Sequence, residues 1–193
     1  GGDYTVTMAS QGPLCFYVLS RSEPGTRIDL NIHFVGARDI SALTASEHEG
    51  FQQALATFSE IYNTVGATLR NVRYLDVDDD TARRYTVVRS HEAVFRLVAT
   101  SRKPSDDPDD VLSVNVFFVD QFAIEGGSVL GVSAGLPGAA GFHGGRGSGL
   151  VFAASVLRDP VLLGHVLAHE VGHYLGLFHS SESGGGRYDP LED

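Results

Sequence analysis

The segment HEVGHYLGLFH spans residues 169–179 and carries three histidines and one glutamate at fixed spacing. Residues four apart in a helix lie on one face, one turn apart, so His169 and His173 are expected to point their imidazoles at one ion. Gly176 can adopt a positive φ, end the helix and turn the chain, which brings His179 back to the same ion. The spacing therefore predicts three histidine ligands on one metal.

The chemistry of this ligand set points to catalysis. Three neutral nitrogens with a fourth position left for water are typical of a catalytic zinc site rather than a closed structural one. Zinc lowers the pKa of its bound water toward neutrality and polarises a carbonyl oxygen. Glu170 follows the first histidine, beside the metal, where it can take the water's proton and pass it to a leaving amine. Hydrolysis of an amide bond fits this arrangement; ordinary helix histidines are the alternative, and the offsets of Gly176 and His179 argue against it.

The residues around the motif predict the helix that carries it, over 159–177. Asp159 is a suitable N-cap, and Pro160 suits the first helical position. Gly176 is expected to form a left-handed C-cap. An apolar stripe is expected to face the core, formed by Leu163, Leu167, Val171 and Tyr174.

The upstream chain alternates between strand and helix patterns. Residues 27–36 alternate polar and apolar side chains and predict a half-buried strand; its apolar face is formed by Ile28, Leu30, Ile32 and Phe34. Residues 46–66 predict a helix with Ser46 as N-cap, Glu49 completing a capping box, and Val65 on its apolar stripe. Further elements are expected as strands at 67–77, 111–122 (central), 127–134 (edge) and 150–155, and as a short helix at 91–101.

This order of elements predicts the fold class. Strand, helix, strand, helix, three strands and helix, with no internal repeat, indicate an α/β or α+β single domain with a mixed sheet. Residues 101–110 are expected to form a polar surface loop and residues 135–149 a glycine-rich loop. Residues 1–26 are expected to be an N-terminal extension, and residues 27–193 the domain itself.

The charge of the chain argues against two classes of partner. Among 193 residues, acidic ones outnumber basic ones 24 to 14, for a formal net charge of -10. Binding to nucleic acid backbones and to anionic membranes both need basic surfaces, so neither partner is expected. No apolar run approaches the length of a membrane span, and the first residues lack the pattern of a signal peptide.

Cys15 is the one cysteine, so no disulfide can form within the chain. Three interpretations stay open. The first is a buried free thiol, the second a disulfide to a segment outside this chain, and the third a thiolate that binds the metal in a latent form.

The motif H-E-x-x-H-x-x-G-x-x-H resembles the signature of the metzincin zinc metallopeptidases. With the YDPLED that follows at 188–193, it is most similar to the pappalysin-type bacterial enzymes. The resemblance implies a twisted mixed sheet with a backing helix and an active-site helix. It implies zinc bound by His169, His173 and His179, with Glu170 as general base. It also implies an edge strand near 127–134, on which a protein or peptide substrate binds as an added strand.

One feature of the metzincins has no counterpart in this sequence. Metzincins carry a methionine-containing turn below the metal, downstream of the third histidine, whereas the only methionine here is Met8. We therefore expect a truncated or cleaved C-terminal subdomain, and a missing C-terminal segment of the same precursor as a partner.

The other histidines are expected to have lesser roles. His165 shares the ligand face and is interpreted as a support for the ligands, with a fourth-ligand role as the alternative. His143 is expected to be solvated in the glycine-rich loop, with contact to substrate at the cleft as the alternative. His33 is expected at the surface of its strand, and no partner is identified for His48 or His91.

Two acidic runs are the remaining candidates for metal binding. DVDDD (76–80) and DDPDD (106–110) are interpreted as solvated acidic loops, with a calcium site as the weaker alternative because carboxylates are its preferred ligands. Neither has the spacing of an EF-hand loop.

The sequence thus favours a secreted zinc endopeptidase. Two alternatives stay open: a catalytically silent binding module that keeps the metal, and a hydrolase of a non-peptide amide. The intact Glu170 argues against the silent module, because such a site needs no base.

Overall fold

A five-stranded mixed sheet forms the centre of the computed structural model, which describes residue 12 and residues 25–101, 113–124, 129–139, 143–177 and 179. Its strands lie in the order β2 (Thr68–Asp76), β1 (Arg27–Val35), β4 (Val114–Val119), β7 (Leu150–Ala153) and β6 (Gly131–Ser133). The first four are parallel, and β6 pairs with β7 in the antiparallel sense. A second, two-stranded sheet pairs β3 (Val87–Val88) with β5 (Gln121–Phe122). The predicted fold class, a mixed α/β sheet with helices, is confirmed.

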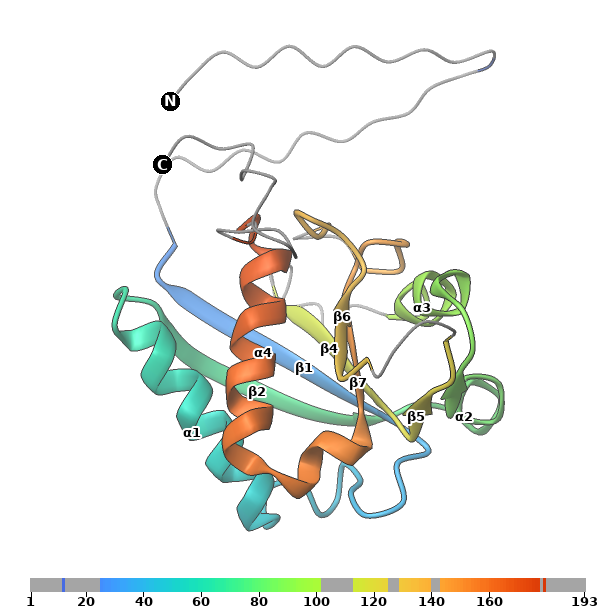
Figure 1. Ribbon diagram of the computed structural model, residues 1–193, viewed down its shortest axis with the longest axis horizontal. Coiled ribbons are helices and arrows are strands. Elements are labelled where there is room, and N and C mark those ends of the chain that lie inside the picture. Colours follow the sequence, from blue (N-terminus) through green and yellow to red (C-terminus); the bar gives the residue numbers. More distant parts are fainter. Residues whose placement is uncertain are drawn as a thin grey trace.

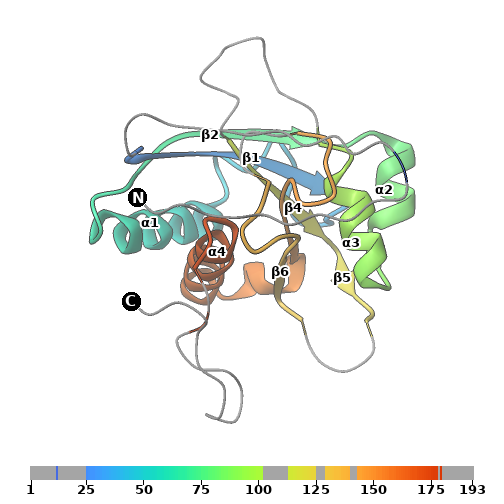
Figure 2. The ribbon, with the colours of Figure 1, turned by 90° about the horizontal axis from the view of Figure 1, so that it is seen from above.

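The helices are divided between two regions of the sheet. The helices α1 (Glu49–Asn63) and α4 (Pro160–Tyr174) lie side by side on one face (Figures 1 and 2). The helices α2 (Asp79–Tyr85) and α3 (His91–Val98) lie together beyond the ends of β1 and β2 (Figure 1). A short 3-10 helix, η2 (Ala154–Arg158), links β7 to α4.

The strand β1 is buried on both faces, where only one was expected. Eight of its nine residues are buried. Ile28, Leu30, Ile32 and Phe34 belong to the core under α1 and α4, as predicted. His33, expected at the surface, is 7% exposed and stacks on Phe117, with ring centroids 4.4 Å apart. The prediction was wrong because parallel strands are covered on both faces, and a polar residue in such a strand need not face water.

The helix α1 begins later than its sequence pattern suggested. Its N-cap is His48, whose Nδ1 accepts a hydrogen bond from the backbone N–H of Phe51 at 3.2 Å. Ser46 lies in the preceding turn, so the predicted capping box was wrong. His48, for which the sequence indicated no partner, has one in the Phe51 N–H. The chain leaves the helix after Asn63, and Val65 is therefore 76% exposed instead of lying on the apolar stripe.

The helix α2 was missed because its first residues were interpreted as a solvated acidic loop. The Asp78 carboxylate accepts hydrogen bonds from the backbone N–H groups of Asp80 and Thr81, at 3.1 and 2.9 Å. These bonds, that of Thr81 above all, hold the pKa of Asp78 below its ordinary value. An acidic first turn is favoured at a helix N-terminus, and the same composition is typical of acidic loops. The calcium interpretation stays a prediction.

The remaining predicted elements are present with shifted ends. The strands expected at 67–77 and 150–155 are β2 and β7, the one expected at 111–122 is β4 followed by β5, and the helix expected at 91–101 is α3. The edge strand expected at 127–134 is β6. The described residues leave out 1–11, 13–24, 102–112, 125–128, 140–142, 178 and 180–193. Cys15, the acidic run at 106–110 and most of the predicted polar loop therefore lie outside them. Within the described residues, no helix has the length and apolar character needed to cross a membrane.

A close approach of α4 to α1 sets the position of α4. A Cβ at Gly164 would lie 2.5 Å from the Thr57 Cβ and 2.8 Å from the Ala54 carbonyl oxygen, so the two backbones meet where α4 has no side chain. The predicted stripe of α4 is buried against the same core, with Leu163, Leu167, Val171 and Tyr174 each at most 2% exposed.

Gly164→Ala is therefore expected to destabilise the chain, although alanine in a helix is favoured over glycine by about 1 kcal/mol. Forcing a methyl group into packed backbone costs about 1–3 kcal/mol. The control is Gly172→Ala on the same helix, where a Cβ would meet its nearest atom, of Leu177, at 3.5 Å, an ordinary contact. Urea denaturation should show a lower midpoint for Gly164→Ala alone. Equal midpoints for the two variants would contradict the packing described here.

Candidate metal centre

The helix α4 begins and ends as its sequence predicts. The Asp159 carboxylate accepts a hydrogen bond from the backbone N–H of Leu162 at 3.0 Å, and Pro160 is the first helical residue. At the other end Gly176 has a φ of 102°. The N–H of Gly176 donates to the carbonyl of His173 and the N–H of Leu177 to that of Gly172, both at 2.9 Å. This is a Schellman motif, and it turns the chain back across the end of the helix.

The turn brings three histidine rings together. The Nε2 atoms of His169, His173 and His179 are separated by 3.0 Å (169 to 173), 2.9 Å (173 to 179) and 3.1 Å (169 to 179). Within the part of the chain that the structure describes, this is the only group of three or more histidine, cysteine or carboxylate side chains whose ligand atoms converge. We call it the histidine triad.

The protonation of His173 follows from its second nitrogen. Its Nδ1 lies 2.7 Å from the carbonyl oxygen of Leu177. A carbonyl oxygen only accepts, so Nδ1 carries the hydrogen, and in the neutral ring Nε2 presents a bare lone pair to the other two rings. A backbone carbonyl that accepts from the outer nitrogen is the usual arrangement around a metal-binding histidine. Burial is the main cause that lowers the pKa of His169 below its ordinary value, followed by the nearby His173 and His179, and this favours the neutral form that binds metal.

The triad fits a zinc ion. An equilateral triangle with sides of about 3.0 Å has its centre about 1.7 Å from each corner, somewhat less than the Zn–N bond of about 2.0–2.1 Å. The three nitrogens would hold such an ion and leave it a position for water. Nitrogen lone pairs this close repel one another unless a proton or a cation lies between them, and imidazole is a preferred ligand of zinc.

Glu170 lies on the side of α4 that faces β6. Its carboxylate accepts a hydrogen bond from the backbone N–H of Ser133, and a Cβ at Gly131 would lie 3.2 Å from its Cγ. Burial raises the pKa of Glu170 above its ordinary value, while His173, the Ser133 N–H and His179 oppose the increase. The base predicted from sequence is thus held between the helix and the edge strand.

Two of the other histidines have partners that the sequence did not reveal. His143, expected to be solvated, is half-buried, and its Nδ1 accepts from the side-chain amide of Asn115 on β4 at 3.0 Å. The Oδ1 of Asn115 in turn accepts from Asn31 at 3.2 Å and lies 3.4 Å from the His33 Nε2. Burial lowers the pKa of His33 to about 4, so its ring is neutral at pH 7. These residues lie on the sheet face opposite α4 and support the glycine-rich loop. His165 is exposed on α4 and does not join the triad.

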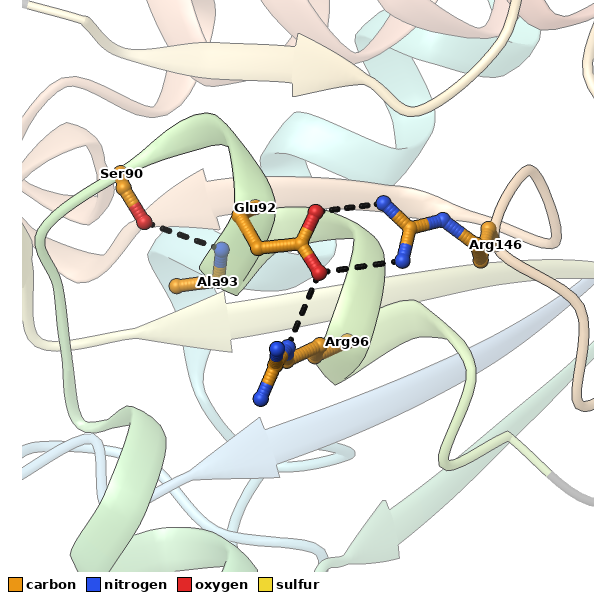
Figure 3. A network of polar contacts seen from close by, with 5 residues as sticks. All are labelled: Ser90, Glu92, Ala93, Arg96 and Arg146. Atoms are coloured by element: carbon orange, nitrogen blue, oxygen red, sulfur yellow. Dashed lines mark hydrogen bonds and ion pairs between the residues drawn. The ribbon is translucent and has the colours of Figure 1, made fainter.

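A second anchor of the glycine-rich loop was also missed from sequence. Both ends of the Arg146 guanidinium donate to the carboxylate of Glu92 on α3, and Arg96 donates to it at 2.9 Å (Figure 3). The Arg146 guanidinium also lies over the ring of Phe95, 5.2 Å from its centroid. Hydrogen bonds from Arg146 and then Arg96 lower the pKa of Glu92 to about 2. The sequence around Arg146 contains no pattern that indicates a partner more than fifty residues away.

Comparison with known proteins finds likeness in structure alone. No family model and no curated protein matches the sequence. Among solved structures, the chain is similar to archaemetzincin from Methanopyrus kandleri, with a TM-score of 0.49 and 17% identity over 82% of this chain and 78% of that one. It is also similar to metalloproteinase-II from Bacteroides fragilis, with a TM-score of 0.46 and 13% identity over 82% of this chain and 45% of that one. The roles proposed for the site residues therefore rest on their own geometry and not on these similarities.

The triad geometry predicts which histidines bind zinc. His173→Ala is expected to weaken zinc binding more than about 100-fold, because it removes a ligand and not merely a group that orients one. His165→Ala, one turn before His169 on the same helix, is expected to leave the affinity unchanged. Competition with a chromophoric chelator measures both. Zinc affinity that falls equally in the two variants, or in neither, would be incompatible with the triad as the metal site.

Proposed function

We propose that the chain is a zinc-dependent endopeptidase whose ligands are His169, His173 and His179 and whose general base is Glu170. The observation that carries this proposal is the convergence of three imidazole nitrogens beside a half-buried carboxylate of the same helix. A closed structural zinc site has four protein ligands and no need of a base, whereas three ligands with an open position are typical of hydrolytic enzymes.

The metal would supply two effects in this site, a lowered pKa of the attacking water and polarisation of the substrate carbonyl. The chain's own residues do the rest. His173 is held in its binding tautomer by the carbonyl of Leu177. A carboxylate oxygen of Glu170 receives the proton of the attacking water and delivers it to the leaving nitrogen. The raised pKa of Glu170 lies nearer to neutral pH than that of an ordinary glutamate. This suits a group that both accepts a proton from water and donates it to the leaving nitrogen.

The edge strand β6 is the proposed binding surface for substrate. Among the strands that the structure describes, it pairs with β7 alone. The N–H of Ala134 donates to Gly149 and that of Ala153 to Leu130, both at 3.0 Å. By the alternation of an antiparallel pair, the backbone groups of Gly131 and Ser133 then point away from β7. The Ser133 N–H donates to Glu170, so a substrate would use the Gly131 N–H and carbonyl and the Ser133 carbonyl. A peptide added along this edge would pass Glu170 and the triad and continue past the site in both directions, which favours an endopeptidase.

The eleven-residue motif and the placement of α4 beneath a mixed sheet with an antiparallel edge strand support assignment to the metzincins. Within them we propose the pappalysin type, on the motif together with the YDPLED at 188–193. Secretion is proposed on the same resemblance.

Glu170→Gln is expected to keep zinc bound and to lower cleavage of labelled casein at least about 100-fold, the usual contribution of a general base. Chelation should abolish cleavage by the unmodified chain, and added zinc should restore it. Glu60→Gln, an exposed glutamate on α1, is the control and should cleave normally. Cleavage that survives Glu170→Gln or chelation would rule out the mechanism. Zinc binding with no hydrolysis of any amide would instead favour a silent binding module, and hydrolysis of small amides alone a non-peptide substrate.

Strand addition along β6 predicts an alternating dependence on the backbone of the substrate. In a cleaved peptide, N-methylation of every second residue near the scissile bond should lower kcat/KM about 5- to 10-fold, because one hydrogen bond contributes about 1 kcal/mol. N-methylation of the residues between them should have little effect. The series is measured with otherwise identical peptides. A uniform loss, or none, would contradict binding as an added strand.

A further inference from the structure

The six residues that follow β6, 134–139, connect the edge strand to the C-terminal end of α4 (Figure 1), and we call them the edge loop. Both ends of this loop are tied to the chain that leads into β7. The N–H of Ala134 donates to the carbonyl of Gly149 at 3.0 Å, and that of Ala139 donates to Gly147 at 2.8 Å. The loop is therefore fixed to the sheet at its ends and contacts the helix from its middle.

This contact completes the hydrogen bonding at the end of α4. The last four carbonyls of a helix have no partner within it. Here the Schellman turn supplies N–H donors to three of them, those of Val171, Gly172 and His173. The fourth, that of Tyr174, accepts from the N–H of Gly138 at 2.8 Å. The last carbonyl of the helix is thus capped by the edge loop and not by the turn of the helix itself.

The packing at this contact leaves no room for a side chain on the loop. A Cβ at Gly138 would lie 2.0 Å from the Cδ2 of Tyr174. The tyrosine is 2% exposed and belongs to the core, so its ring cannot move aside without disturbing other residues. Pro137 lies against Gly176, where a Cβ would be 3.7 Å from the proline Cβ. The edge loop therefore contacts both the last residue of the helix and the residue at which the chain turns.

We propose that the edge loop positions the histidine triad, with Gly138 as the positioning residue. The inference rests on the proposed function, because it takes the triad as the metal site. His173 directly precedes Tyr174 in the chain, and His179 follows Gly176 by three residues. The loop thus contacts the chain between the second ligand and the third, where the direction of the turn is set.

A small displacement at this contact is enough to disturb a metal site. Three residues span at most about 10 Å, so a tilt of about ten degrees at Gly176 would move His179 by up to about 2 Å. Metal sites keep their ligand distances within about 0.2 Å. The contact of the edge loop with Tyr174 and Gly176 limits such a tilt, and the third imidazole is held where the other two converge.

The same contact makes the metal and the edge loop depend on each other. Coupling between two binding events is reciprocal. If the docked loop raises the affinity of the triad for zinc, bound zinc must stabilise the docked loop by the same factor. The N–H of Gly138 reports this directly, because its hydrogen exchanges with solvent only when its bond to Tyr174 opens.

The first test compares Gly138→Ala with Gly147→Ala, the matched control, where a Cβ would meet its nearest atoms, of Ala139, at 3.6 Å, an ordinary contact. Competition with a chromophoric chelator gives the zinc affinities of variants that circular dichroism shows to be folded. Gly138→Ala should bind zinc at least about 10-fold more weakly, the usual result of removing a support of a ligand. Gly147→Ala should bind zinc as the unmodified chain does.

The visible absorption spectrum of bound cobalt(II) gives a second readout on the same variants, because it follows the coordination geometry of the metal. The spectrum should change in Gly138→Ala alone. A role of Gly138 in stability only would lower the midpoint of urea denaturation and leave both the zinc affinity and the cobalt spectrum unchanged. That result would overturn the inference.

Amide hydrogen exchange in the unmodified chain is a test that needs no variant. It is followed by NMR with and without zinc. Bound zinc should slow the exchange of the Gly138 N–H at least about 10-fold more than that of the Ala123 N–H, by the reciprocity of the coupling. The Ala123 N–H donates to Val88 in the second sheet at 2.7 Å and is the reference. Equal slowing of both would show that zinc stabilises the whole chain alike and would overturn the inference.

These tests measure metal binding and not cleavage, so they separate this inference from the proposed function. A chain that gives the expected affinities, spectra and exchange rates but cleaves no peptide would support the role of the edge loop and refute the endopeptidase.

Discussion

The contact between α1 and α4 at Gly164 is the constraint on which the rest of the site depends. At that point the helix backbones approach so closely that a methyl group has no room. The approach, together with the buried stripe of Leu163, Leu167 and Val171, holds α4 in one rotation about its axis. That rotation decides where His169, Glu170 and His173 point, because each of them is attached to this one helix. A helix free to roll by a few tens of degrees would turn Glu170 away from the edge strand.

From this placement α4 divides the site into two sides. On one side Glu170 accepts a hydrogen bond from the Ser133 N–H of β6, which among the described strands pairs with β7 alone. On the other, the end of α1 and Leu177 enclose an apolar cavity. The Schellman turn at Gly176 places the histidine triad between them, since it returns His179 to the helix and orients His173 through the Leu177 carbonyl. One helix thus carries two of the three triad histidines, Glu170 and part of the lining of the cavity.

The wrong predictions for His33 and His143 and the missed partner of Arg146 share a physical cause. His33 was expected at the surface and His143 in solvent, yet both contact Asn115 on β4. Asn115 follows His33 by more than eighty residues and precedes His143 by nearly thirty. Arg146 and Glu92, which also pair, are 54 residues apart in sequence. Such contacts depend on which strands become neighbours. The cap of α1 failed for a different reason: Ser46 and His48 both precede the helix, and the turn before it decides which one lies at its N-terminus.

The sequence by itself determined the features that depend on spacing along one helix and its turn. These are the Asp159 cap, the buried stripe of α4, the left-handed Gly176 and the register that allows His169, His173 and His179 to meet, because 3.6 residues per turn and a single positive φ are local properties. The tertiary structure alone decided that Glu170 lies under β6, that β1 is covered on both faces, and that a cavity opens between α1 and α4. Each of these depends on the packing of segments distant in sequence, and no local pattern encodes the neighbour that a residue will meet.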